Sequence, residues 1–242
     1  MMGSFVATNE NDKEELALAV KKQENAAGKA LGHLALHYKT PEDGPRAAKL
    51  LELMGMKRVQ EIPFGGGVVF YQFAVADDAS GRGIGTLYLS MVPPPLATIT
   101  QAIRQALKVG TAQEHAAVAG LREGMLQDPE MMFHVGLMMD SLEEVERLML
   151  TLRHANEHDP DLKGRLRLLC NKAKPGDAEI DARMQTSAVF GATPRHTYGM
   201  YGVQAFVETD LLAGGPLGES MVIELDFAFS SHPDNMFVKT IV

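Results

Sequence analysis

The sequence predicts an α+β protein in which two tandem βαβββ modules form a curved sheet cup. Two observations carry this prediction. An apolar segment of strand length that begins at His33 recurs later in the chain at His134, and a helical pattern follows both copies. Each helical pattern is followed by further strand-like segments, which glycine-rich turns separate. Because the same order occurs twice, we expect one structural unit to be repeated.

The first strand of each copy should point its histidine away from the helix. Alternation along a strand places Leu34 and Leu36 on one face and His33 on the other. The same rule places Val135 toward the helix in the second copy and His134 on the opposite face. Both histidines are therefore expected to line the concave side of the cup.

A helix start follows each histidine at the same spacing. Thr40 and Ser141 each lie seven residues after the histidine, and both are residue types that cap helix N-termini. Ser141 also has Glu144 in the capping-box position. We expect both residues to be N-caps.

The last strands of the two copies align with Tyr88 opposite Glu224. His33 and Tyr88 are 55 residues apart, whereas His134 and Glu224 are 90 residues apart, so the second copy carries about 35 extra residues. We place this insertion within about 157–200 and regard it as a candidate lid. The strands expected after the helices lie at 57–62, 68–75 and 86–92 in the first copy, and at 202–208 and 221–229 in the second.

These patterns divide the chain into four segments. They are an N-terminal helical extension (1–30), a first βαβββ module (31–95), a helical linker (96–130) and a second module with the insertion (131–242). An N-terminal helix is expected over residues 9–29.

Composition excludes several classes of function. The formal net charge of −8 removes the basic surface that nucleic acid binding requires, and the longest apolar runs are too short to span a bilayer. The N-terminus lacks a secretory signal pattern, so we expect a cytoplasmic protein. The single cysteine, Cys170, excludes a disulfide framework and a cysteine-based zinc site. The expected partners are a small-molecule substrate and a second copy of the chain in a homodimer. Whether the modules pair within one chain or across the dimer stays open.

A repeated βαβββ module with these histidines and a glutamate on the final strand resembles the vicinal oxygen chelate superfamily. That group includes glyoxalase I, the bleomycin-resistance proteins and the type I extradiol dioxygenases. The resemblance covers about residues 30–92 and 131–229, and it implies that His33, His134 and Glu224 bind a metal ion. The family's fourth ligand position falls on Tyr88, which leaves two histidines and one carboxylate. This set suits Fe(II) and leaves coordination positions open.

Residues before the penultimate strand are candidates for acid–base catalysis. The resemblance to extradiol enzymes implies a role for His196 or Tyr198, although this chain has Phe206 and a longer loop at 210–218 where those enzymes carry a tyrosine and a short turn. A surface loop is the alternative interpretation of His196 and Tyr198. Asp226 could orient a ligand imidazole or lie on a solvated rim.

Three hypotheses for the function follow. The leading one is an Fe(II) extradiol-type dioxygenase that cleaves a small aromatic diol. The second is a glyoxalase- or epimerase-like isomerase that uses another divalent metal, such as Mn, Zn, Ni or Co. The third is a metal-free small-molecule-binding protein of the resistance type, in which the strand histidines are ordinary rim or core residues.

Overall fold

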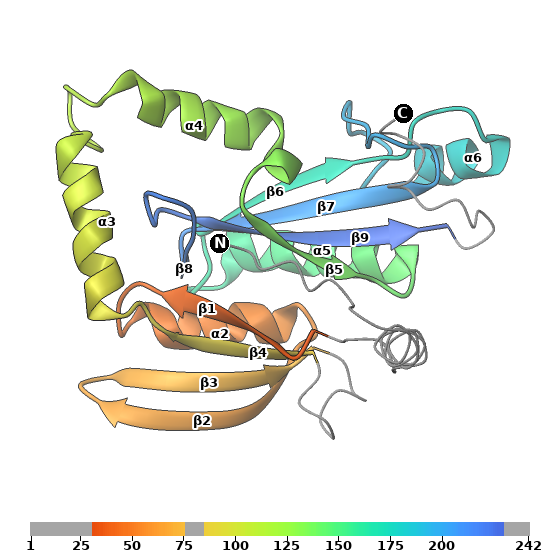
Figure 1. Ribbon diagram of the computed structural model, residues 1–242. Helices are drawn as coiled ribbons and strands as arrows, with labels where there is room; N and C mark the ends of the chain where they lie inside the picture. Colours follow the sequence, from red (N-terminus) through yellow and green to blue (C-terminus); the bar gives the residue numbers. More distant parts are fainter. Residues whose placement is uncertain (1–30, 76–84, 230–242) are drawn as a thin grey trace, which may run out of the picture.

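A computed structural model of the chain describes residues 31–75 and 85–229 (Figure 1). Both modules follow the predicted βαβββ order. The first module consists of β1 (His33–Tyr38), α2 (Asp43–Leu53), β2 (Lys57–Gly65), β3 (Val68–Ala74) and β4 (Thr86–Met91). The second consists of β5 (His134–Met138), α5 (Leu142–His158), β6 (Leu166–Asn171), β7 (Gly202–Thr209) and β9 (Met221–Ala228). The predicted fold class is thereby confirmed.

The two sheets share one topology. Their strand orders are β2-β3-β4-β1-β8 and β5-β9-β7-β6, and both sheets are open. In each module the first strand runs parallel to the last strand, which is antiparallel to the strand before it. The short strand β8 (Leu212–Ala213) adds to the free edge of β1. A loop of the second module therefore completes the sheet of the first.

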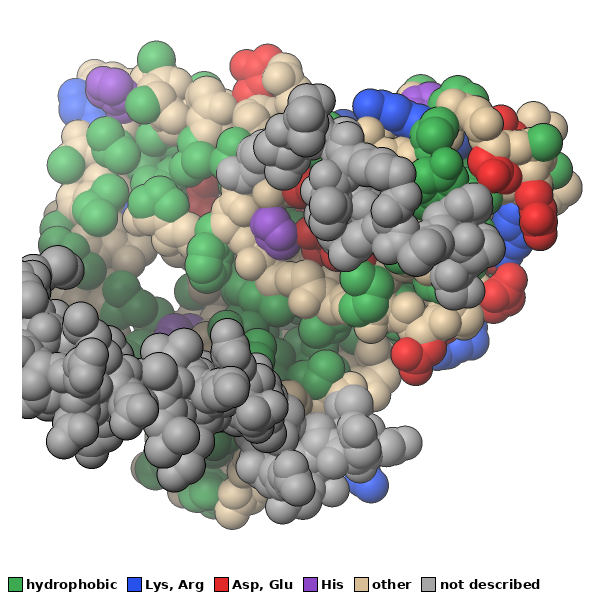
Figure 2. All heavy atoms as spheres, turned by 45° about the vertical axis from the view of Figure 1, so that its right-hand side comes forward, with side chains coloured by type: hydrophobic (Ala, Val, Ile, Leu, Met, Phe, Trp, Pro, Cys, Tyr) green, Lys and Arg blue, Asp and Glu red, His purple; other side chains and the backbone are tan. Residues whose placement is uncertain are grey.

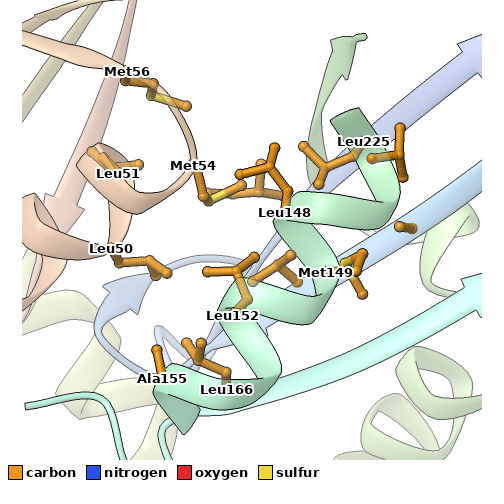
Figure 3. Close-up of a cluster of buried hydrophobic side chains, with 14 of the residues drawn as sticks. Leu50, Leu51, Met54, Met56, Leu148, Met149, Leu152, Ala155, Leu166 and Leu225 are labelled. Atoms are coloured by element: carbon orange, nitrogen blue, oxygen red, sulfur yellow. The ribbon is translucent and has the colours of Figure 1, made fainter. Parts of the chain in front are cut away.

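The two module helices meet in a shared hydrophobic core. Leu50 of α2 and Met54, which directly follows that helix, face Leu148 and Leu152 of α5, and all four side chains are buried (Figure 3). Burying a side chain of this size stabilises the fold by about 1.5–3 kcal/mol. Since each helix covers one face of its own sheet, the opposite faces remain for the histidines.

The helix starts differ between the modules. Ser141 is the N-cap of α5, as predicted, and its side chain accepts a hydrogen bond of 3.2 Å from the Glu144 N–H. The prediction for Thr40 is wrong, because α2 begins later and Glu42 occupies the N-cap position without a side-chain cap. Thr40 closes a turn in front of the helix instead: its carbonyl accepts from the Asp43 N–H, and its hydroxyl donates to the Asp43 carboxylate.

Two helices form an arch between the modules. They are α3 (Pro94–Ala106) and α4 (Ala116–Gln127), and the short 3-10 helix η2 (Pro129–Met131) follows them. The arch is visible at the left and top of Figure 1. Within these two described helices, Val118 is the one buried residue. The linker is thus helical, as expected from residues 96–130, but it packs loosely on the rest of the chain.

The extra residues of the second module lie between β6 and β7, at 172–201. They include α6 (Ala178–Thr186). The interval of about 157–200 inferred from the sequence also contains β6, which is a strand of the sheet. The structure therefore confines the insertion to residues 172–201. The expected N-terminal extension (1–30), with its helix at 9–29, lies outside the described residues. None of the described helices has the length and apolar character needed to cross a membrane.

Candidate functional site

The open face of the second sheet gathers the candidate residues. Gly136 lies opposite Glu224 between β5 and β9, and Gln204 of β7 lies opposite Asp226. Because strand residues two apart share a face, His134 lies on the same side of the sheet as these residues. In the first sheet, Ala35 lies opposite Tyr88, so the predicted equivalence of Tyr88 and Glu224 is confirmed.

His134 and Glu224 are in direct contact. The imidazole Nε2 is 2.9 Å from Oε2 of Glu224, whose side chain is only 3% exposed. The other ring nitrogen, Nδ1, is 2.8 Å from the carbonyl oxygen of Met132. A carbonyl only accepts hydrogen bonds, so Nδ1 carries a proton and Nε2 is directed at the carboxylate. This orientation is the one that metal-binding histidines use in proteins.

A chain of hydrogen bonds reaches Glu224 from the insertion. Arg195 donates from Nε to Oδ1 of Asn171 at 2.8 Å, and the Asn171 amide donates to Gln204 at 3.4 Å. Gln204 in turn donates to Oε1 of Glu224 at 2.7 Å. Since an arginine can only donate, both amides must point their N–H groups toward Glu224. The relay therefore holds the Glu224 carboxylate in a fixed orientation.

Further carboxylates surround this pair. Burial raises the pKa of Glu224, and burial together with the negative charge of Glu224 raises the pKa of Asp226. Burial also raises the pKa of Glu130. In the described part of the chain, Oδ1 of Asp226 and Oε2 of Glu130 are buried without a hydrogen-bond partner. Two buried carboxylate oxygens without partners, next to the His134–Glu224 contact, destabilise the fold unless they bind a proton or a cation.

Gly136 leaves room in front of these oxygens. A Cβ atom at this position would lie 3.5 Å from Oδ2 of Asp226 and 4.0 Å from Oε2 of Glu224. The absence of a side chain on Gly136 keeps the approach to both carboxylates open.

The equivalent face of the first sheet is aromatic. The rings of His33 and Tyr88 lie 4.8 Å apart, and Tyr88 also contacts Phe70 at 5.4 Å. His37, which shares this face, is 3.1 Å from the Ser90 hydroxyl through Nδ1. His33 is exposed, as its place opposite the helix predicts.

The predicted ligand set fits a metal ion in part. His134 and Glu224 supply a nitrogen and an oxygen donor side by side, which suits a divalent ion. His33 belongs to the other sheet and contacts the Tyr88 ring at a tilt of 32°. Within residues 31–75 and 85–229, no group of three or more His, Cys, Asp or Glu side chains is arranged to hold a metal. The structure brings two of the three predicted ligands together.

The predicted acid–base residues lie in the insertion. His196 is exposed and pairs by its backbone with Lys172. Tyr198 donates from its hydroxyl to Oδ2 of Asp128 at 2.5 Å, and this hydrogen bond raises the pKa of Tyr198 to about 12. Tyr198 thus ties the insertion to the segment that follows α4.

Sequence reasoning missed Gln204, Asn171 and Arg195. Gln204 and Asn171 sit among apolar residues on β7 and β6, and each is buried. A buried amide needs a partner, so an amide inside an apolar strand was the available signal. Nothing in the sequence pattern indicated that Arg195 would reach Asn171.

Comparisons with known proteins give the following. No protein-family model matches the chain, and the search of curated proteins gave no match. Among solved structures, the chain is similar to a protein from Ralstonia eutropha JMP134 described as a glyoxalase superfamily member, with 12% identity, a TM-score of 0.23, and coverage of 91% of this chain and 78% of the other. It is also similar to hydroxyglutarate synthase from Pseudomonas putida (13% identity, TM-score 0.22, 89% and 56% covered) and to an uncharacterized protein from Shigella flexneri (16% identity, TM-score 0.23, 88% and 60% covered).

The chain spans little more than half the length of the last two proteins. TM-scores this low support no statement about activity, substrate or ligand. The strand pairing establishes the fold without these neighbours. In both modules, the first strand of the βαβββ unit pairs in parallel with the last strand. The described residues therefore form two tandem βαβββ modules, the arrangement that the sequence resemblance to the vicinal oxygen chelate superfamily implied.

Proposed function

We propose that this protein is a metal-dependent enzyme of the vicinal oxygen chelate type that moves a proton on a small oxygen-bearing substrate, as a glyoxalase- or epimerase-like isomerase does. The observation that carries the proposal is the buried His134–Glu224 contact with Asp226 beside it. It supplies two ligands and, in hydrogen-bond contact with Glu224, a further carboxyl group that can exchange a proton.

Each residue has a distinct role in this proposal. His134 and Glu224 hold the metal, and the Met132 carbonyl and Gln204 fix their orientation. A bound divalent metal would polarise the oxygens of the substrate and make the neighbouring C–H group more acidic. Asp226, with its raised pKa, takes the proton from carbon and returns it at the adjacent position. Gly136 leaves the space through which the substrate approaches.

A ring-cleaving Fe(II) dioxygenase is the second candidate. The presence of a second strand histidine, His33, on the open face of β1 favours it. This function requires His33 as a third ligand and His196 or Tyr198 as the acid–base group, whereas the isomerase requires none of these three. The isomerase is therefore the simpler proposal from the geometry.

Metal content tests the shared part of both proposals. The protein is purified without oxygen or chelators, and bound metals are measured by mass spectrometry. We expect about one divalent ion per chain, lost in His134→Ala and in Glu224→Gln. His158→Ala is the matched control, because His158 is an exposed histidine near the end of α5. Full metal content in both site variants, or no metal in the unaltered protein, would exclude both enzymes and favour a metal-free binding protein.

Two assays then separate the enzymes. Incorporation of deuterium from D₂O into α-hydroxycarbonyl compounds, followed by NMR, supports the isomerase, and Asp226→Asn should abolish it while metal content stays. Oxygen consumption with catechols supports the dioxygenase, and His33→Ala should then remove both metal and activity.

We also propose that the protein forms a homodimer. Size-exclusion chromatography with light scattering tests this directly against the 26.3 kDa of one chain.

A further inference from the structure

A cavity of about 290 Å³ lies beneath the arch. Its walls come from α4, from the segment before β5, and from the loop between β8 and β9, none of which belongs to the βαβββ pattern. Its apolar lining includes Leu121 and Met125 of α4 together with Met132, Phe133 and Leu217. Figure 2 shows hydrophobic side chains gathered along the arch around a hollow. The volume is at the lower end of the roughly 300–1,000 Å³ that small-molecule pockets occupy.

The floor of this cavity is the same sheet face that carries the candidate site. Arg167 and Glu208 lie opposite each other on β6 and β7, and both line the cavity. Glu208 lies opposite Val222 of β9, two residues before Glu224. Because strand residues two apart share a face, the cavity and the Glu224 carboxylate are neighbours on one surface.

A second contact links the cavity to His134. Met132 lines the cavity, and its carbonyl oxygen accepts the Nδ1–H of His134. A molecule that fills the cavity would therefore contact Met132, the residue that orients the candidate metal ligand His134.

The charges that line the cavity balance, since two arginines and two glutamates are among its residues. Arg122 donates two hydrogen bonds to Glu219 at 3.0 and 2.7 Å, and Arg167 forms an ion pair with Glu208. Among the described residues, Nη1 of Arg167 is buried without a hydrogen-bond partner. A charged ligand would have to compete with these pairs and lose its own hydration. A neutral ligand gains from the Leu, Met and Phe walls at no such cost, and methionine side chains adapt readily to its shape.

From the shared face, the apolar walls and the balanced charges we propose that this cavity binds the apolar body of the substrate, a neutral hydrocarbon ring or short chain, whose oxygen-bearing end reaches His134 and Glu224. The assignment of the ligand as substrate rests on the proposed function. The binding of a neutral apolar molecule does not, because it depends only on the cavity.

Titration with N-phenyl-1-naphthylamine tests the binding. This neutral probe fluoresces in apolar surroundings, and the chain contains no tryptophan that would overlap its signal. We expect saturable binding of one probe per chain. Met125→Phe, which fills the cavity from α4, should weaken the affinity by roughly tenfold, a change of about 1.4 kcal/mol. Ile99→Phe is the control, since Ile99 is an exposed α3 residue outside the cavity.

Leu121→Trp gives a second measurement that does not depend on the probe's own fluorescence. The new side chain would be the one tryptophan of the whole sequence, and the probe should quench its emission by energy transfer with the same affinity that the probe's own fluorescence gives for this variant. Thermal melting checks that each variant is folded.

Failure of this inference is distinguishable from failure of the proposed function. Absence of saturable binding, or equal affinity in the unaltered protein and Met125→Phe, overturns the cavity assignment whatever the metal analysis gives. His134→Ala should lose metal and keep the probe, whereas Met125→Phe should keep metal and lose most of the probe. Loss of both properties in both folded variants would also contradict the assignment, since the two groups of residues would then not act separately.

Discussion

The two modules share one backbone topology and present opposite chemistry on their open faces. In the first sheet, the residue opposite Ala35 is Tyr88, whose ring contacts the ring of His33. In the second, the residue opposite Gly136 is Glu224, which contacts His134. The same position in the repeat thus carries an aromatic ring in one copy and a buried carboxylate in the other. The fold therefore fixes the position of this residue on the open face of the sheet, and the type of side chain there determines whether the face is aromatic or acidic.

The surroundings of the two positions explain why they tolerate such different residues. Tyr88 is half-buried among rings and needs no charged partner. Glu224 is almost fully buried, and Gln204 and His134 both contact its carboxylate. The insertion supports this arrangement through Arg195 and covers the edge strand β6, whereas most side chains of the corresponding edge strand β2 are exposed.

Exchanging the two residues should produce the largest effect. Glu224→Tyr forces a ring into a closed site and leaves the Gln204 amide without its acceptor, so we expect a loss of about 3 kcal/mol or more. For a domain of this size, that corresponds to a fall of roughly 6–12 °C in melting temperature. Tyr88→Glu, at a half-buried position, should cost about 1 kcal/mol. If calorimetry gives the same loss of unfolding free energy for both variants, the two sheet faces do not differ in how well they tolerate the exchange.

Stability should fall with rising pH, and the cause lies in the second module. Glu224 and Asp226 have raised pKa values in the folded protein, so the folded state retains protons that the unfolded state releases above about pH 4. The stabilisation is complete below that pH and is lost as the pH rises through the folded pKa values.

Thermal melts from pH 4 to 9 without metal measure this dependence. The double variant Glu224→Gln, Asp226→Asn should flatten the profile, while Glu61→Gln on the exposed strand β2 should leave it unchanged. A divalent metal should raise the melting temperature most at high pH, where the carboxylates are ionised. If the melting temperature of the double variant still falls with pH as steeply as that of the unaltered protein, other groups cause the pH dependence.

Removing the amide of the relay should have an intermediate effect. Gln204→Ala deprives Glu224 of its donor and leaves Asn171 without an acceptor, and we expect a loss of about 1–3 kcal/mol in urea unfolding. Gln72→Ala is the matched control, because Gln72 lies opposite Tyr88 in the first sheet. If both variants lose the same free energy, the relay contributes nothing specific.

The smallest effect is expected at Tyr198. Tyr198→Phe removes the hydrogen bond to Asp128 and should cost about 1 kcal/mol. Because that bond raises the pKa of Tyr198 to about 12, the phenol should stay protonated through pH 11. Ultraviolet titration of the unaltered protein and the variant should then give the same phenolate absorbance up to that pH. A difference between the two near pH 10 would mean that Tyr198 titrates as an ordinary tyrosine.

The sequence by itself determined the repeat, the strand on which each histidine lies and the equivalence of Tyr88 with Glu224. These features depend on alternation and spacing within single strands, which local sequence records directly. It also located the N-cap at Ser141, but it placed the start of α2 too early, because the turn closed by Thr40 and Asp43 competes with the helix.

Only the tertiary structure decided which groups meet. Glu224 gains Gln204 from the neighbouring strand and His134 from a strand almost a hundred residues away, and Arg195 reaches the same network from the insertion. His33 has the same local pattern as His134, yet it packs on Tyr88. Strand pairing and the packing of the linker over the sheet both bring together residues that are far apart in the sequence. No local pattern in the sequence encodes which carboxylate becomes buried or where the arch leaves a cavity.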